Sequence, residues 1–302
     1  MKNKLIMVFL DGVGIGEANP EKNPFFKYPF NTFRSILGDT PSLQKSTISE
    51  ADNYVFPSDP IFGVDGLPQS GTGQNSIFCG IKAPQIINQH FGPYPHSTLH
   101  PYIKRENIFE VLKHNGLSSV FVNAYPRLFF NYVRSGKTRL SVTTLSCIFS
   151  GIPLNKAAEL RAGKALAADI TNERWITQLK YKMPLIKPEL AAKRLIRISR
   201  ENDFSLFEYF LTDHLGHHRN LDQLKSTLQE LDLFLYTLLT EFNREDTTVL
   251  ICSDHGNLED ISIKTHTRNP ALTISAGYKA KQLMENVTDN SQIKKEILDI
   301  LK

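Results

Sequence analysis

The chain has 302 residues, 41% of them hydrophobic, and a formal net charge of +4, so it is long enough to bury a large core. It has no block of Lys and Arg with interleaved aromatic residues, which disfavours nucleic acid as a partner, and no segment approaches the roughly 18 apolar residues of a membrane span. Its 3 widely spaced cysteines are typical of buried free thiols in a reducing compartment. We therefore expect a globular cytoplasmic protein with no membrane partner.

The first predicted element is a strand at residues 5–10, which follows a short basic start. The apolar run is short and lacks a small-residue cleavage site, so we interpret it as a first strand and not as a signal peptide. It ends at Asp11 in a Gly-rich turn, and a long polar and aromatic loop is expected up to about residue 68. The next segment, SGTGQNSIFCGIKAP at 70–84, predicts a helix with Thr72 as its N-cap and Gly80 near its end.

Further along the chain, apolar residues at helical spacing alternate with short apolar runs. We predict helices that begin at residue 108 and span 155–170, 189–201 and 221–242, and strands at 119–123, 205–211 and 248–252. Strands that alternate with helices of this length favour an α/β fold, doubly wound, with a mainly parallel sheet and helices on both faces. We expect one domain over residues 1–302.

Three of the predicted strands end next to an aspartate, namely Asp11, Asp213 and Asp254. In open α/β sheets the ligand crevice lies outside the carboxyl ends of the strands. The three carboxylates should therefore meet at one edge of the sheet.

Histidines accompany these acids. His217 stands four residues after Asp213, on the same side of a helical turn, while His255 directly follows Asp254 and His266 stands eleven residues further on. Carboxylate and imidazole ligands without a thiolate suit Mn²⁺ or Zn²⁺, and there are enough of them for two ions. Two metal ions about 4 Å apart can clamp an in-line displacement at phosphorus.

A nucleophile is expected at a helix N-terminus beside the metal ions. The loop SGTGQNS provides Thr72, whose hydroxyl metal coordination would activate and where free N–H groups favour a phosphate. Ser70 and Ser76 are alternative hydroxyls, and Thr72 can also be read as a residue that only caps the helix.

Taken together, these residues resemble the alkaline phosphatase superfamily of metalloenzymes, and within it cofactor-independent phosphoglycerate mutase and phosphopentomutase. The matching pieces occur in the family's order and span nearly the whole chain: VFLDGVGIGEANP, GLPQSGTGQNS, FLTDHLGHHRN, CSDHGNLED and THTRNP. The resemblance implies an alkaline phosphatase-like fold with two divalent metal ions.

The resemblance also implies roles for individual residues. One metal ion would be bound by Asp213, His217 and His266, and a second by Asp11, Asp254, His255 and the nucleophile hydroxyl. The spacing of the mutases selects Thr72 as the nucleophile, whereas sulfatase-like spacing selects Ser70. The predicted substrate contacts are Asn75, Arg127 and Arg219.

The chain departs from both mutases in size. The mutases carry a large inserted cap domain, but here only residues 73–212 separate Thr72 from Asp213, so a reduced cap at 134–185 or at 85–105 is all that fits. We therefore predict a metal-dependent phosphohydrolase that acts on a small phosphate ester through a phospho-threonine. The alternatives are a phosphomutase and a non-catalytic metal-containing binding protein, and the substrate and the oligomeric state stay open.

Overall fold

The computed structural model describes residues 3–137, 139–218 and 220–302. Within these ranges one sheet of seven strands runs in the order β2-β3-β7-β6-β1-β5-β4. The strands are β1 Lys4–Leu10, β2 Ile48–Glu50, β3 Asn53–Ser58, β4 Ser119–Phe121, β5 Phe204–Tyr209, β6 Thr247–Ser253 and β7 Ala271–Gly277.

The sheet is parallel at its centre and antiparallel at one edge. Strands β6, β1, β5 and β4 pair in parallel, as the sequence predicted. Strand β7 pairs antiparallel with β6 and with β3, and β2 pairs antiparallel with β3. The prediction of a doubly wound, mainly parallel sheet is thus confirmed, but the strands β2, β3 and β7 were not predicted.

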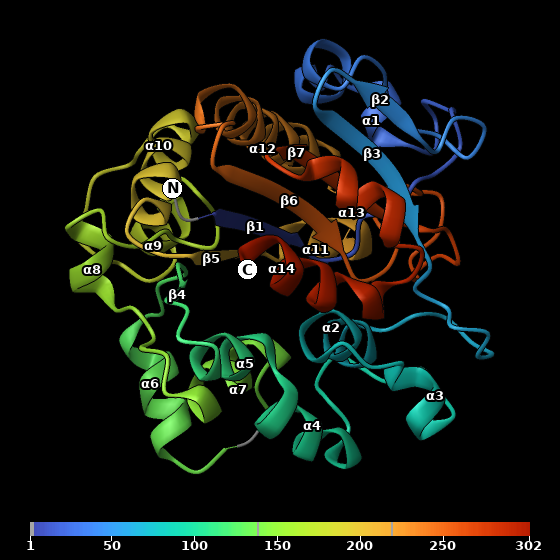
Figure 1. The fold of residues 1–302 in the computed structure, drawn as a ribbon. Helices are drawn as coiled ribbons and strands as arrows, with labels where there is room; N and C mark the ends of the chain where they lie inside the picture. Colours follow the sequence, from blue (N-terminus) through green and yellow to red (C-terminus); the bar gives the residue numbers. More distant parts are fainter. Residues whose placement is uncertain (1–2, 138, 219) are drawn as a thin grey trace.

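Helices and short helical turns connect and cover the strands (Figure 1). The helices are α1 Pro24–Lys27, α2 Ser70–Cys79, α3 Ala83–Ile87, α4 His100–Glu106, α5 Ile108–His114, α6 Arg127–Arg134, α7 Val142–Ser150, α8 Ala157–Arg161, α9 Glu173–Thr177, α10 Pro188–Ser199, α11 Leu211–His218, α12 Leu221–Glu241, α13 Ala280–Asn286 and α14 Ile293–Leu301. A π-helical turn η1 spans Thr32–Ile36, and 3₁₀ turns span Ser97–Leu99 (η2) and Asn290–Gln292 (η3).

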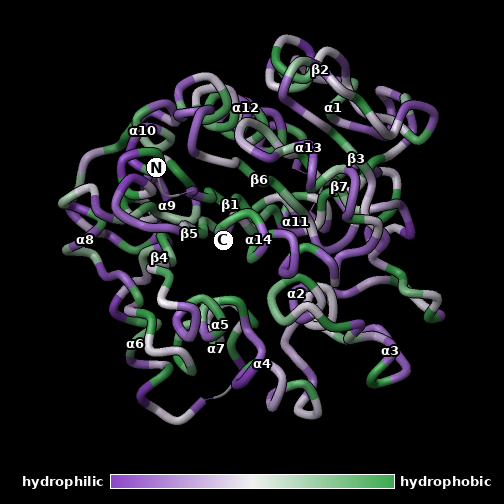
Figure 2. The backbone as a smooth tube through the Cα atoms, in the orientation of Figure 1, coloured by the Kyte–Doolittle hydropathy of each residue, from purple (hydrophilic) through white to green (hydrophobic). Residues whose placement is uncertain are grey.

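The two faces of the central strand β1 belong to different hydrophobic clusters. Ile6 and Val8 pack on one face with residues of α10 and α12, whereas Met7 and Phe9 pack on the other with residues of α2, α5, α7 and α14. The alternation follows from the period of two in a strand. Figure 2 shows β1 as a mostly hydrophobic strand in the middle of the molecule.

The helix predicted at 155–170 is wrong in its extent. Only α8 forms there, and the rest of the segment is turns and extended chain around the positive-φ residues Gly163 and Ile170. A small cluster of buried residues, separate from the two main ones, lies in this part of the chain and includes Leu160, Ala165 and Trp175. A reduced cap at 134–185 stays a proposal, since α7 of this segment packs into the main core.

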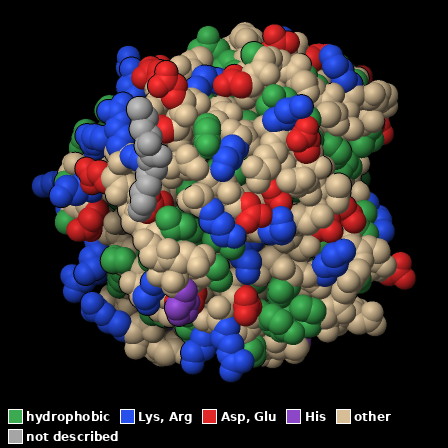
Figure 3. Space-filling model, viewed as in Figure 1, with side chains coloured by type: hydrophobic (Ala, Val, Ile, Leu, Met, Phe, Trp, Pro, Cys, Tyr) green, Lys and Arg blue, Asp and Glu red, His purple; other side chains and the backbone are tan. Residues whose placement is uncertain are grey.

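The surface in Figure 3 carries Lys and Arg interspersed with Asp and Glu. No helix among the described residues is both long enough and apolar enough to span a membrane.

Candidate metal centre

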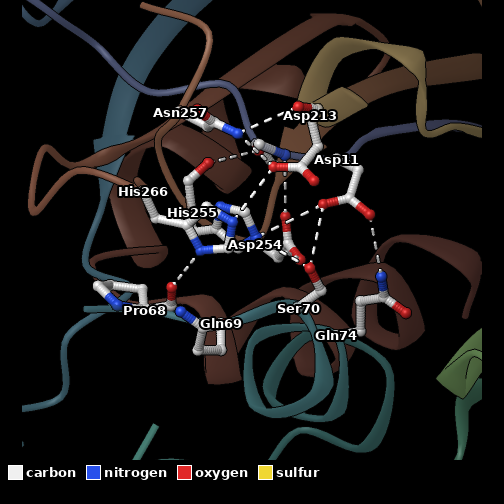
Figure 4. Close-up of polar contacts among 12 residues, drawn as sticks. Asp11, Pro68, Gln69, Ser70, Gln74, Asp213, Asp254, His255, Asn257 and His266 are labelled. Carbon is white, nitrogen blue, oxygen red and sulfur yellow. Dashed lines mark hydrogen bonds and ion pairs between the residues drawn. The ribbon is translucent and has the colours of Figure 1, made fainter. Parts of the chain in front are cut away.

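The three aspartates predicted to converge do converge at one edge of the sheet. Asp11 follows β1, Asp254 follows the neighbouring strand β6, and Asp213 lies in the first turn of α11, which begins directly after β5. Because β1 lies between β6 and β5, the three carboxylates come from adjacent strand ends. Figure 4 shows them facing one another above the start of α2.

The first predicted set of ligands forms a compact group. His217 Nε2 lies 3.3 Å from Asp213 Oδ2, and His266 Nε2 lies 3.3 Å from Asp213 Oδ1. The two Nε2 atoms are 3.2 Å apart. Asp213 and His217 stand four residues apart on α11, as expected from the sequence, so one helical turn presents both side chains to the same point.

The outer nitrogens of these histidines point at backbone carbonyls. His217 Nδ1 lies 2.8 Å from the Lys264 oxygen, and His266 Nδ1 lies 2.7 Å from the Pro68 oxygen. Both Nδ1 atoms therefore carry the proton, and neutral rings would present two lone pairs to each other across 3.2 Å. A cation held between these nitrogens and Asp213 removes that repulsion, so the group fits a divalent metal ion.

The second predicted set gathers around His255. Its Nε2 lies 3.5 Å from Asp11 Oδ1, 3.5 Å from Asp254 Oδ2 and 3.0 Å from the Ser70 hydroxyl. Asp254 Oδ2 is buried without a hydrogen-bond partner among the described residues. A buried, unpartnered carboxylate oxygen is costly, and a metal ion would satisfy it. Asp213 also lies close enough to join Asp11 and His255 as a ligand group, so it borders both sets.

The electrostatics of this second set point in the same direction. Burial, with the nearby charges of Asp254 and Asp213, raises the pKa of Asp11 well above its usual value. Burial and the charge of Asp213 also raise the pKa of Asp254 to about 7. Burial, with the neighbouring His266, lowers the pKa of His255 to about 3. Buried acids that resist ionisation beside a neutral imidazole are matched to a bound cation, which stabilises the ionised carboxylates.

The structure separates the two candidate nucleophiles. Ser70 is the first residue of α2, and its hydroxyl faces Asp11 and His255. The Thr72 hydroxyl instead donates to the Gln69 carbonyl oxygen and accepts from the Phe91 N–H. Thr72 is also not the N-cap, which is Gln69, so the predicted cap is wrong. Residues two apart in a helix point in different directions, so only one hydroxyl can face the ligands.

Close packing of α2 against β6 depends on a residue without a side chain. A Cβ on Gly73 would lie 2.8 Å from the Asp254 Cβ atom. Gly12, with φ of +68°, lies similarly close to Asp213. Gly73 and Gly12 thus let α2 and the turn after β1 approach the carboxylates.

The predicted substrate contacts do not gather at the centre. Asn75 is fully buried, and its amide donates to the Gly71 carbonyl oxygen within α2. Arg127 is exposed at the start of α6, and its backbone N–H donates to the Tyr181 hydroxyl. Arg219 lies outside the described residues. The alternative hydroxyl of Ser76 donates to the Thr72 carbonyl oxygen and is equally remote.

Two residues of the centre were not singled out from the sequence. Asn257 donates to Asp213 Oδ1 at 2.6 Å and so fixes the orientation of that ligand, and its place in the DHGN stretch was the available signal. Glu208 is buried on β5, accepts from the Thr143 hydroxyl at 2.7 Å, and has a pKa raised to about 7 by burial. A glutamate within a predicted strand carried no signal of its own.

A cavity of about 910 Å³ opens from the centre. At one end it is lined by Asp11, Ser70, Gln74, Asp213 and His217. Its other end is lined by side chains from the segment between β4 and α10, including several aromatic ones. Among the described lining residues, neither Asn75 nor Arg127 contributes to it.

Known proteins resemble the chain in part of its sequence and in its fold. Residues 168–302 match the Metalloenzyme superfamily. A 2,3-bisphosphoglycerate-independent phosphoglycerate mutase from Ehrlichia canis (strain Jake) is 28% identical over 132 residues. That match covers 39% of this chain and 26% of the mutase, so the chain matches about a quarter of the length of this curated relative.

Several solved structures share the fold along the whole chain. The PH0037 protein from Pyrococcus horikoshii has a TM-score of 0.59 at 14% identity, covering 100% of this chain and 97% of the other. The alkaline phosphatase from the Antarctic bacterium TAB5 has a TM-score of 0.55 at 13% identity, covering 100% and 98%. The superfamily match over residues 168–302, the mutase relative and the shared fold support the resemblance to alkaline phosphatase superfamily metalloenzymes that the sequence indicated.

Proposed function

We propose that the protein is a two-metal phosphohydrolase, in which Ser70 receives the phosphoryl group of a small ester and water then releases it. The observation that carries this proposal is the position of the Ser70 hydroxyl, 3.0 Å from His255 Nε2 and 3.4 Å from Asp11 Oδ1 at the start of α2. Ser70 takes the role first expected of Thr72, whose hydroxyl is engaged with backbone groups elsewhere.

Two sets of residues would hold the ions. The first is Asp213, His217 and His266, and the second is Asp11, Asp254, His255 and the Ser70 hydroxyl. When bound, Mn²⁺ or Zn²⁺ would lower the pKa of the nucleophile hydroxyl and offset the negative charge of the phosphoryl group.

The chain itself orients these groups. Gln74 Nε2 donates to Asp11 Oδ2 at 3.4 Å, and Asn257 donates to Asp213. Both carboxylates are therefore oriented before a substrate enters. Ser70 stands at the positive end of the ten-residue helix α2, where an approaching phosphate is favoured. The first turn of α2 thus serves both to present the hydroxyl and to attract the anion.

Access of water supports hydrolysis over isomerisation. The His217 side chain is 37% exposed and Phe210 is 42% exposed, and both line the cavity. A mutase has to exclude water while the phosphoryl group is on the enzyme, and a closing cap is one means to do so. Only residues 73–212 are available for such a cap here. The mutase relative at 28% identity makes a phosphomutase the second candidate.

The test compares Ser70→Ala with Thr72→Val in metal-loaded protein. Phosphate monoesters, including phosphoglycerates and pentose phosphates, are supplied while free phosphate, positional isomers and acid-trapped phosphoprotein are measured. We expect Ser70→Ala to lose phosphate release and phosphoprotein, and Thr72→Val to keep both.

Three results would contradict parts of the proposal. A phosphopeptide labelled at Thr72 would restore the threonine as nucleophile. Isomers that form without free phosphate would establish the mutase. Absence of all turnover and of all bound metal in wild-type protein would favour the non-catalytic alternative.

A further inference from the structure

The far end of the cavity differs chemically from the metal centre. It is lined by Tyr125, by Phe129 and Tyr132 of α6, and by Trp175 and Leu179 at α9. Tyr125 and Phe129 stack with ring centroids 4.0 Å apart and an interplanar angle of 23°. Tyr125 is held in place by a 3.0 Å hydrogen bond between its hydroxyl and that of Thr144. A rigid aromatic wall therefore faces the phosphoryl-transfer centre across one continuous cavity.

The size of the cavity exceeds the needs of a very small ester. At about 910 Å³ it lies at the upper end of the range of about 300–1,000 Å³ that is typical of drug-sized ligands. A three-carbon phosphate would occupy only the metal end. The aromatic end would then hold water against apolar side chains, which is unfavourable.

The charges of the wall argue against a second anionic group on the substrate. Among the described lining residues only Arg139 and Arg174 are permanently cationic. Arg139 is exposed, and the charge of Arg174 acts on the buried carboxylate of Asp169. A polyanionic substrate would find little compensating charge away from the metal ions.

We propose that the substrate is a phosphate monoester whose leaving group carries a flat, uncharged ring, which stacks against the wall of Tyr125, Phe129, Tyr132 and Trp175. Offset stacking and apolar burial bind the ring, while the phosphate meets Ser70 and the metal ligands. This inference rests on the proposed function for its phosphate end, but the ring-binding wall can be tested without turnover.

The first experiment uses two esters that differ only in the ring, 4-phenylbutyl phosphate and butyl phosphate. Their leaving alcohols are alike in the carbon that bears the phosphate, so a difference reports binding of the ring. We expect kcat/KM to be about 10- to 100-fold higher for the phenyl ester, mostly through KM. Phe129→Ala should remove most of this preference, because it lowers kcat/KM for the phenyl ester much more than for the butyl ester.

Phe130→Ala is the matched control. Phe130 is the neighbouring phenylalanine of α6, packs edge-on against Phe129 at 5.6 Å, and is not among the described residues that line the cavity. It should keep the preference. Equal kcat/KM for the two esters, or equal loss in both variants, would overturn the ring inference and leave the phosphohydrolase intact.

The second experiment needs no turnover. Trp175 is the single tryptophan of the sequence and lines the cavity, so tryptophan fluorescence reports occupancy of the aromatic end. In metal-loaded protein, 4-phenylbutylphosphonate should change the fluorescence at a concentration at least about tenfold lower than butylphosphonate does. If the ring compound binds in this way but no ester is hydrolysed, the proposed function fails and the ring site stands. If the two phosphonates act alike, the ring site is wrong.

Discussion

The two ends of the cavity are built in different ways. The metal end takes its side chains from the ends of β1 and β6 and from α11, which starts directly after β5, so the sheet fixes their positions. The aromatic end takes its side chains from short helices and turns between β4 and α10: Trp175 and Leu179 pack in the small separate cluster, whereas Tyr125, Phe129 and Tyr132 pack against one of the main clusters. Under our two proposals, the reaction depends on residues that the sheet positions, and the selectivity depends on residues of the helices and turns between β4 and α10.

The largest expected effect falls on the metal end. His266→Ala removes one of the three proposed ligands of the first ion, so turnover should fall at least about 100-fold and the metal content should fall from the expected two ions per chain to one. Elemental analysis and phosphate release measure these effects. His218→Ala is the matched control, because His218 is exposed and stacks on His214 away from the ligand groups. Unchanged metal content in His266→Ala would move the ion elsewhere.

An intermediate effect is expected from Glu208, the buried carboxyl of β5 beside the centre. Its folded-state pKa is raised to about 7 by burial, whereas the unfolded chain has a value near 4.5. The folded state therefore retains a proton that the unfolded state releases, and stability falls as pH rises from about 4.5 to about 7. Glu208→Gln should remove this fall.

The measurement is denaturant unfolding of metal-free protein at pH 5 and at pH 8. The unfolding free energy of Glu208→Gln minus that of wild type should be larger at pH 8 than at pH 5, by up to about 3 kcal/mol. Gln keeps an oxygen that can accept from the Thr143 hydroxyl, so the substitution changes little besides the charge. The same difference at both pH values would show that Glu208 ionises normally in the folded protein.

The smallest effect is expected from Thr72→Val, which changes a residue of α2 that faces away from both ends of the cavity. The variant loses the hydrogen bonds to the Gln69 oxygen and from the Phe91 N–H. We expect a loss of about 1–3 kcal/mol in unfolding free energy, with turnover within a few-fold of wild type. Thermal unfolding and phosphate release test this together. A large loss of turnover at unchanged stability would return Thr72 to the reaction.

The sequence by itself determined the class of fold and most of the candidate ligands. Buried parallel strands read as continuous apolar runs, and each aspartate at a strand end inherits its position from the strand. The spacing of Asp213 and His217 fixed their common direction through the geometry of one helical turn. Those relations are local or set by the sheet, so they can be read from a chain.

Tertiary structure decided the rest. Ser70 and Thr72 both lie in the first turn of α2, and the rotation of that turn decides which hydroxyl faces the ligands. Packing of Gly73 against Asp254 sets the rotation. Strand β3 was not predicted because it contains Pro57, which disfavours a strand, and because it pairs with β7, which is distant in the sequence. The fold brings residues 125–132 and Trp175 to one cavity, although no sequence period relates them. The sequence therefore indicated phosphoryl chemistry, and only the folded chain led to the proposed ring.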